Sequence, residues 1–288
     1  EQLKDIPGRG VDEVTDPSKL QKKSAESGNI NYRYAIAILA PLLRKNREKI
    51  QQIPFKTFQY GATERHKVAY SLSPASSAKT YQLIFLPQLD VYYPVTSNSN
   101  SKTPVLFFIY GGSFTSGARN LSAKFGLVYA NLGAFFARRG ILTVIPDYRL
   151  VPTVQYPQNV EDVRDAIEWV VQNVGDVEAW APYDGKEASE GSGAKQGRLE
   201  LDLEKICILG HSAGAFLSAS LLLNSSILPL SSPLRPRLAG LALFGGPYTL
   251  ASIVPGTPRA LAYAEVFGSL EKAKEHDMPS LLRRYPEG

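Results

Sequence analysis

Short apolar runs alternate with longer stretches of helical periodicity through most of the chain. Four runs are apolar and bounded by turn residues, which predicts buried strands at Val105–Tyr110, Ile141–Ile145, Ile206–Leu209 and Leu238–Phe244. Between them, residues 160–174 and 213–223 space their apolar side chains as helices do. Strands that alternate with helices predict a doubly wound, mostly parallel α/β sheet covered by helices.

The N-terminal part follows a different pattern. Residues 1–30 are polar and punctuated by glycine and proline, so we expect a flexible arm there. From Asn31 to Ile53 the apolar residues fall roughly on one face and basic residues on the other, which predicts a helix that packs on the domain. We assign 31–288 to one α/β domain, with a surface loop at Asp184–Arg198.

Composition narrows the class of protein. The chain has 288 residues, 44% of them hydrophobic and 20% charged, which suffices for one substantial core. The longest apolar run of the N-terminal part, Tyr34–Leu43, contains Pro41 and falls short of the roughly 20 residues that cross a bilayer, so we expect no membrane span. The net charge of +5 is scattered along the chain, and we expect no nucleic-acid partner.

Cysteine and histidine give little sign of further chemistry. Cys207 is the single cysteine, so no internal disulfide can form, and we expect a cytoplasmic protein, although a leader could have preceded Glu1. The three histidines lie far apart and none has metal-ligand spacing, so we expect neither a metal nor a cofactor. The oligomeric state is not predicted.

One motif carries specific chemistry. The apolar run at Ile206–Leu209 leads directly into Gly210-His211-Ser212-Ala213-Gly214, the G-x-S-x-G pattern of a nucleophile elbow. The two glycines allow a sharp turn from strand to helix at which a larger side chain would collide with the backbone. The pattern predicts an exposed Ser212 hydroxyl at a helix N-terminus.

A second motif lies about a hundred residues upstream. The predicted strand ends in Tyr110-Gly111-Gly112-Ser113-Phe114, and such glycines let backbone N–H groups approach a developing oxyanion. A Gly-Gly pair after a strand is on its own most often a simple turn. Upstream of an elbow, we interpret it as an oxyanion-hole loop.

The chain resembles the α/β-hydrolase superfamily, in particular the branch of hormone-sensitive-lipase-like esterases, feruloyl-esterase-like domains and kynurenine formamidases. The resemblance extends over about 57–288. It is carried by four ordered motifs: Tyr110–Phe114, Pro146-Asp147-Tyr148-Arg149-Leu150, Tyr156-Pro157 leading into 161–166 and Trp169, and Gly210–Ala215. Tyr110 stands where many relatives have histidine.

The resemblance implies a role for each motif residue. Ser212 would be the nucleophile, and the N–H groups of Gly112, Ser113 and Ala213 would form the oxyanion hole. The residues expected to support these motifs are Tyr110, Gly111, Gly210, His211 and Gly214. The alternative for Ser212 is a helix N-cap without a catalytic role. For the remaining motif residues we expect structural roles: Asp147, Arg149, Asp162 and the core residue Trp169.

The residues that should complete a catalytic triad are not evident. In this fold an acid and then a histidine follow the serine, each after a later strand. No aspartate occurs between Ala213 and Glu275, and no strand-like apolar run follows Phe244. We expect His276 to sit at a helix end rather than to act as the base, and we interpret the domain as C-terminally truncated.

Residues 68–88 separate two parts of the family pattern. Removing Val68–Gln88 joins Lys67 to Leu89 and restores that pattern, and Phe85-Leu86-Pro87-Gln88 can be encoded by a pyrimidine-rich tract ending in CAG. We favour a retained intron. A natural surface hairpin is the alternative, because long loop insertions carry a modest entropic cost.

Together these features predict a serine hydrolase that cleaves a small-molecule carboxylic ester, or less readily an amide, through an acyl-enzyme on Ser212. The alternative is a catalytically inactive binding protein on the same fold, or a fragment, because the triad acid and histidine are not evident.

Overall fold

The structure is a computed structural model that describes residues 32–61, 67–69, 82–84, 87–95, 101–120, 126–181 and 199–285. The chain divides into two compact units, Glu1–Gln52 and Ile53–Gly288. The arm expected at 1–30 and the loop expected at Asp184–Arg198 both lie outside the described residues. The second unit contains both chemical motifs.

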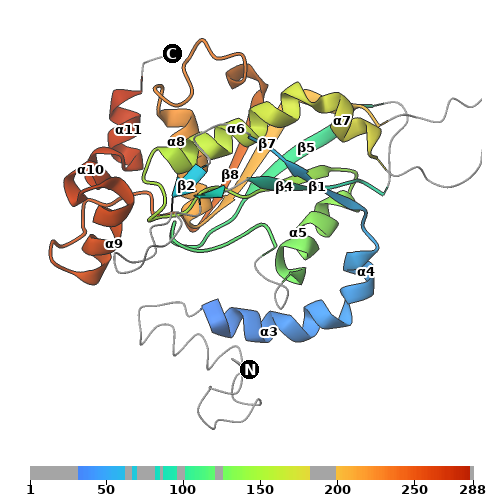
Figure 1. Cartoon of the computed structure of the whole chain (residues 1–288), viewed down its shortest axis with the longest axis horizontal. Helices are drawn as coiled ribbons and strands as arrows, with labels where there is room; N and C mark the ends of the chain where they lie inside the picture. Colours follow the sequence, from blue (N-terminus) through green and yellow to red (C-terminus); the bar gives the residue numbers. More distant parts are fainter. Residues whose placement is uncertain are drawn as a thin grey trace, which may run out of the picture. The chain divides into compact units, whose positions relative to one another are not determined.

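A six-stranded sheet forms the centre of the second unit (Figure 1). Its order is β1-β4-β6-β5-β7-β8. The strands are β1 Phe55–Gln59, β4 Gln88–Tyr92, β5 Thr103–Ile109, β6 Leu142–Pro146, β7 Leu201–His211 and β8 Leu238–Phe244. The last four in spatial order, from β6 to β8, run parallel, whereas β4 is antiparallel to both of its neighbours. The sheet is therefore mostly parallel, as predicted.

Helices cover the two faces of this sheet (Figure 1). Helix α8 (Ala213–Leu223) packs on β7, β8 and β5 and against α6 (Gln158–Gln172), while α5 (Leu127–Ala137) packs on β4 and β6. Helix α8 is apolar and largely buried on all sides, which is typical of a helix in the centre of a layer. Its N-terminus is consequently held firmly at the carboxyl end of β7.

The four predicted strands and two predicted helices are all present. Leu238–Phe244 and 213–223 have the predicted bounds, and the predicted helix at 160–174 is α6, followed at once by the short α7 (Val174–Ala179). Strand β7 starts five residues before the predicted Ile206, at Leu201. Strand β1 has no apolar pattern that predicts it, because its residues are all exposed or half-buried.

The N-terminal unit contains two helices where one was predicted over Asn31–Ile53. Helix α3 (Tyr32–Lys45) and helix α4 (Arg47–Gln51) are separated at Asn46. The Asn46 side chain donates a hydrogen bond to the carbonyl of Leu42 at 2.9 Å, and such local bonds compete with regular helix. The packing of this unit on the domain stays a prediction.

Short elements complete the second unit. Strands β2 (Lys67–Ala69) and β3 (Gln82–Ile84) pair antiparallel in a separate two-stranded sheet within the segment interpreted as an insertion. Gln88, the last residue of that segment, belongs to β4 of the main sheet. Whether 68–88 is an insertion stays a prediction.

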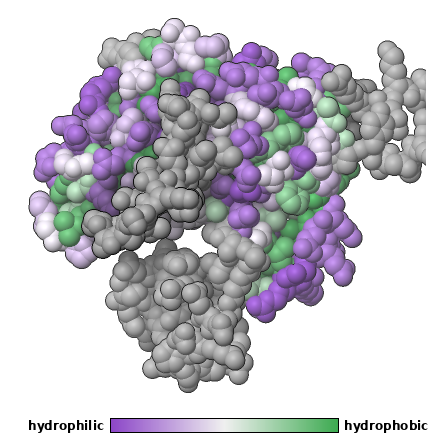
Figure 2. Space-filling model, viewed as in Figure 1, coloured by the Kyte–Doolittle hydropathy of each residue, from purple (hydrophilic) through white to green (hydrophobic). Residues whose placement is uncertain are grey.

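The C-terminal part contains a 3₁₀ turn and three helices but no further strand among the described residues. The turn is Arg235–Arg237, and the helices are α9 Pro258–Phe267, α10 Leu270–Glu275 and α11 Met278–Arg284. In Figure 2 this part of the surface is mostly hydrophilic with small hydrophobic patches, in line with exposed leucines at Leu261 and Leu282.

Candidate active site

Ser212 lies at the junction between β7 and α8. Its backbone angles, φ 52° and ψ −119°, fall in a region that residues other than glycine rarely adopt. The Ser212 N–H donates to the carbonyl of Phe244 at 2.8 Å, which ties the turn to the end of β8. The hydroxyl makes no capping bond to α8, so the structure does not show the N-cap alternative. The chain thus turns sharply from strand to helix at the position where the sequence predicts a nucleophile elbow.

The two elbow glycines are required by close backbone contacts. A Cβ on Gly214 would lie 2.1 Å from the carbonyl oxygen of Ile109, and a Cβ on Gly210 would lie 2.6 Å from the Cα of Ala215. Both distances are far below van der Waals contact. The absence of side chains at these positions therefore lets α8 begin directly against β5.

The second motif lies beside the elbow. Strands β5 and β7 are parallel neighbours, with Ile109 opposite Gly210, so the residues after both strands meet at one edge of the sheet. A Cβ on Gly111 would lie 2.8 Å from the Ser212 Cβ and 3.1 Å from the carbonyl oxygen of His211. Gly111 thus contacts the nucleophile position directly, and the structure brings both predicted motifs together.

The residues after Gly111 have an unusual backbone. Gly112 has φ 144°, and the two following residues, Ser113 and Phe114, have φ values of 54° and 67°. Positive φ in a non-glycine residue costs of order 1–3 kcal/mol and persists only where surrounding contacts impose it. Here the backbone is held by hydrogen bonds of the Gly112 and Phe114 carbonyls and by packing of the Phe114 ring.

Backbone N–H groups near Ser212 are left without partners by this arrangement. Within the described part of the chain, no hydrogen bond is made by the N–H groups of Gly112, Ser113 or Ala213. Ala213 is the first residue of α8, so its N–H belongs to the positive end of the helix dipole. The three N–H groups expected to form the oxyanion hole therefore have no partner among the described residues, and they belong to the two segments that meet at Ser212.

The middle of the loop is fixed by a turn and by aromatic packing. The carbonyl of Gly112 accepts hydrogen bonds from the N–H groups of Thr115 and Ser116, and the carbonyl of Phe114 accepts one from Val151. The Phe114 ring is buried and packs edge-on against Phe216 of α8, with ring centroids 5.7 Å apart.

The far end of the loop is fixed by charge. The Arg119 N–H donates to Asp147 Oδ1 at 2.7 Å, and the Arg119 guanidinium forms ion pairs with Asp147 and Asp90. The same guanidinium donates to Gln88 Oε1 at 2.7 Å. Sequence reasoning missed Arg119, because a lone arginine in a loop carries no periodic or motif signal.

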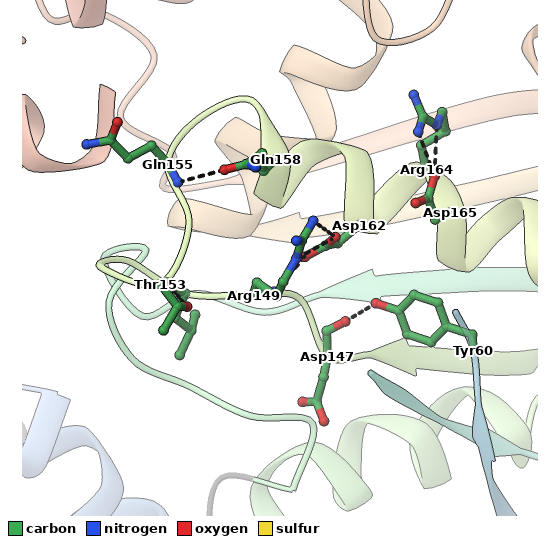
Figure 3. A network of polar contacts seen from close by, with 10 residues as sticks. Tyr60, Asp147, Arg149, Thr153, Gln155, Gln158, Asp162, Arg164 and Asp165 are labelled. Carbon is green, nitrogen blue, oxygen red and sulfur yellow. Dashed lines mark hydrogen bonds and ion pairs between the residues drawn. The ribbon is translucent and has the colours of Figure 1, made fainter. Parts of the chain in front are cut away.

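Asp147 has contacts on both its side chain and its main chain. The Tyr110 hydroxyl donates to Asp147 Oδ1 at 3.1 Å. The Tyr60 hydroxyl donates to the main-chain carbonyl of Asp147, from the opposite side to the carboxylate (Figure 3). Burial, and then the neighbouring Asp147 charge, raises the pKa of the Tyr110 phenol well above its ordinary value.

A buried ion pair joins the segment after β6 to α6 (Figure 3). Arg149 and Asp162 are 3% and 0% exposed, with Arg149 Nη2 2.6 Å from Asp162 Oδ1. Burial alone would lower the pKa of Arg149, but the bonds and charge of Asp162 outweigh it and the pKa is raised. These residues hold the segment on α6, which is the structural role expected from sequence.

Two other residues of the predicted motifs, Trp169 and His211, differ in burial. Trp169 is half-buried rather than in the core, with its ring 5.5 Å from that of Phe58. His211 is exposed at the end of β7.

The candidates late in the chain have partners of their own. His276 ends α10, with Nδ1 2.8 Å from the Lys272 carbonyl and its ring against Tyr156. Asp277 accepts from the N–H groups of Ser280 and Leu250, and so caps α11. In the described part of the chain, no histidine or carboxylate side chain forms a hydrogen bond with Ser212.

Comparisons with known proteins agree with this architecture. A protein-family model described as BD-FAE matches residues 89–179, from β4 to α7. The solved structure of esterase B from Lactobacillus rhamnosis superposes with a TM-score of 0.50 and 14% identity, covering 96% of this chain and 73% of that one. The chain therefore has the α/β-hydrolase fold that the resemblance implied.

Two sequence relatives have names that state an activity. A probable isoprenylcysteine alpha-carbonyl methylesterase of Oryza sativa subsp. japonica is 28% identical over 193 residues, which make up 65% of this chain and 38% of that protein. A kynurenine formamidase of Meyerozyma guilliermondii is 26% identical over 174 residues, 60% of this chain and 53% of that one. The matched region thus spans about half or less of these relatives.

Two further properties bear on the class of site. None of the helices in the described ranges is long and apolar enough to cross a membrane. Within the same ranges no cluster of histidine, cysteine and carboxylate side chains is arranged to hold a metal ion.

Proposed function

We propose that this protein hydrolyses carboxylic esters of small molecules through an acyl-enzyme on Ser212. The observation that carries the proposal is the contact between the two motifs: Gly111 lies against Ser212, and N–H groups without a partner among the described residues flank the serine in both segments. A serine hydroxyl beside preorganised donors is the arrangement that acyl transfer requires.

The reaction would proceed in two steps. Ser212 Oγ attacks the ester carbonyl carbon, the Oγ–C bond forms, the bond to the alkoxy oxygen breaks, and the serine proton ends on the departing alcohol. Water then attacks the acyl carbon, which releases the carboxylic acid and returns a proton to Ser212. Both steps pass through a tetrahedral oxyanion.

The donors would act at that oxyanion. Gly112, Ser113 and Ala213 offer N–H groups whose positions are fixed before the substrate binds, so no reorganisation is needed when charge develops. Loss of one such donor typically lowers kcat by about 10² to 10³.

The class of substrate follows from the relatives. One has a name that states methylester hydrolysis and the other a name that states formamide hydrolysis, and both reactions pass through the same kind of intermediate. An ester is the easier substrate, because an alcohol is a better leaving group than an amine. We therefore propose an ester as the substrate and an amide as the secondary one.

Turnover of p-nitrophenyl acetate, butyrate and octanoate tests the proposal. Wild-type protein should release p-nitrophenol, and Ser212→Ala should reduce the rate to that of buffer while leaving the thermal melt intact. Cys207→Ser serves as the matched control, because it removes the one other strong nucleophile on β7. Equal rates for wild type and Ser212→Ala would overturn the proposal and favour a binding function.

A further inference from the structure

The loop from Gly111 to Arg119 has a strained backbone in its middle, and Asp147 binds its last residue. Ser113 and Phe114 both have positive φ, although neither is glycine. Such a backbone relaxes unless its surroundings determine it. The start of the loop is fixed by β5, so its conformation depends on what holds the other end.

The other end is held by one carboxylate. Asp147 Oδ1 accepts from the Arg119 N–H at 2.7 Å and from the Tyr110 hydroxyl at 3.1 Å, so one oxygen contacts the residues on both sides of the loop. The second oxygen, Oδ2, pairs with the Arg119 guanidinium. The Asp147 carboxylate therefore links Tyr110, before the loop, to Arg119, at its end.

Arg119 extends this contact to strand β4. Its Nε donates to Asp90 Oδ1 at 2.9 Å and its Nη2 to Gln88 Oε1 at 2.7 Å, both on β4. The side chain of Asp90 is 5% exposed and that of Arg119 is 15% exposed, so water screens these bonds only weakly. Arginine suits the position, because its planar fork can meet three acceptors at once.

The loop also packs tightly within itself. A Cβ on Gly117 would lie 2.8 Å from the carbonyl oxygen of Gly111 and 2.9 Å from the ring of Tyr110. Displacement of Arg119 would pull on Gly117, and through this contact on the residue that touches Ser212. A chain of contacts thus leads from Asp147 through Arg119, Gly117 and Gly111 to Ser212.

We propose that Asp147, through Arg119 and Tyr110, is a positioning residue that holds Gly112 and Ser113 in the conformation needed to donate to the oxyanion on Ser212. The inference rests on the proposed function. It assigns Asp147 an effect on the transition state rather than on substrate binding, because its side chain contacts the loop and not the serine.

Inactivation by a fluorophosphonate tests this role. Ser212 Oγ forms a bond to phosphorus, the P–F bond breaks and fluoride leaves, the hydroxyl proton passes to water, and the phosphoryl oxygen occupies the oxyanion position. For Arg119→Ala and Asp147→Ala we expect the maximal inactivation rate constant kinact to fall at least about tenfold, with the half-saturating concentration KI changed less than about threefold. Arg119→Lys keeps the charge but not the fork and should recover part of the rate.

Controls separate positioning from general destabilisation. Lys102→Gln removes an exposed ion pair with Glu200 and should leave kinact unchanged. Amide hydrogen exchange of 111–119 should quicken in Arg119→Ala, with the Arg119 N–H losing its protection in Asp147→Ala, while β7 stays protected. If a variant does not fold, Arg119→Lys carries the test.

The outcomes distinguish this inference from the function on which it rests. If the wild type is labelled and Arg119→Ala is labelled at the same rate, the positioning role is wrong. If the wild type is not labelled, the proposed function fails, and hydrogen exchange alone tests the positioning role of Asp147. Unchanged exchange in 111–119 of the variants overturns that role, and faster exchange there supports it.

Discussion

Gly111 and Ser212 are in direct contact although they are about a hundred residues apart in the chain. A Cβ on Gly111 would come within 2.8 Å of the Ser212 Cβ. The contact exists because β5 and β7 are parallel neighbours in register at Ile109 and Gly210, so both chemical segments leave the sheet at the same edge. This one relationship places the proposed nucleophile, Ser212, beside its proposed oxyanion donors.

A methyl group at Gly111 should therefore affect chemistry more than folding. Gly111→Ala places its Cβ 2.8 Å from the Ser212 side chain and 3.1 Å from the His211 carbonyl, so the loop must shift by a few tenths of an ångström. We expect ester turnover to fall by about 10² or more, as for loss of an oxyanion donor. Rates of p-nitrophenyl ester hydrolysis check this, and full activity would contradict the contact.

Gly214 should be intolerant of any side chain for a structural reason. In Gly214→Ala the Cβ would lie 2.1 Å from the Ile109 carbonyl oxygen and 2.4 Å from that of Tyr110, both backbone atoms that cannot rotate away. We expect the free energy of unfolding to fall by several kcal/mol, or the variant not to fold. Gly175→Ala, on α7 with nothing within 4 Å, is the matched control and should stabilise by up to about 1 kcal/mol in urea unfolding.

The buried pair of Arg149 and Asp162 should be costly to break. Asp162→Ala would leave the Arg149 guanidinium buried with its main counter-charge removed, for which about 3–5 kcal/mol is typical. Lys102→Gln at the exposed pair with Glu200 should cost far less, because water screens an exposed pair. Urea unfolding of both variants measures the difference, and similar costs would contradict the structure.

Buried tyrosines should make the protein sensitive to alkali. Burial raises the pKa of Tyr60, Tyr110 and Tyr148 well above their ordinary value, and that of Tyr129 to about 12. The unfolded chain releases these protons near pH 10 while the native state keeps them, so the unfolded state binds fewer protons. Stability should be full below about pH 10 and fall as the pH rises above it.

Tyrosinate absorbance measured together with circular dichroism checks this linkage. In the native state fewer tyrosines should ionise at about pH 11 than in the urea-unfolded chain, and the remainder should ionise only as the protein unfolds. Complete ionisation near pH 10 with the secondary structure intact would contradict the burial of these phenols.

His276 should be dispensable for chemistry. Its Nδ1 lies 2.8 Å from the Lys272 carbonyl and its ring packs on Tyr156, so we expect His276→Gln to leave ester turnover within about threefold while lowering stability by up to about 1.5 kcal/mol. A loss of 10³ or more without a change in the thermal melt would identify it as a base.

Local pattern was enough to predict the elbow and its sheet. Ser212 and its flanking glycines form a contiguous motif, and β8 is an unbroken apolar run, so both could be recognised without knowledge of any distant contact. The turn at Gly111-Gly112 could be recognised as well, because its glycines follow a strand directly. Its role as an oxyanion-hole loop stays a prediction.

Contacts between distant segments were not predictable in this way. Arg119 meets Asp90 and Asp147, which precede and follow it by 29 and 28 residues, and no periodicity connects the three. The positive φ values of Ser113 and Phe114 likewise arise from tertiary contacts, since neither residue type favours them. The helix predicted over Asn31–Ile53 is divided at Asn46, whose side chain donates a hydrogen bond to the Leu42 carbonyl. A pattern of apolar residues gives no sign of such a bond.

Mapping of a fluorophosphonate adduct tests the central claim most directly. Wild-type protein is incubated with the probe, digested, and the modified peptide is identified by mass spectrometry, with Ser212→Ala and Cys207→Ser in parallel. We expect a single adduct on Ser212, which is absent from Ser212→Ala and unchanged in Cys207→Ser. No adduct on the folded wild type, or an adduct that persists in Ser212→Ala, would contradict the assignment of Ser212 as the nucleophile.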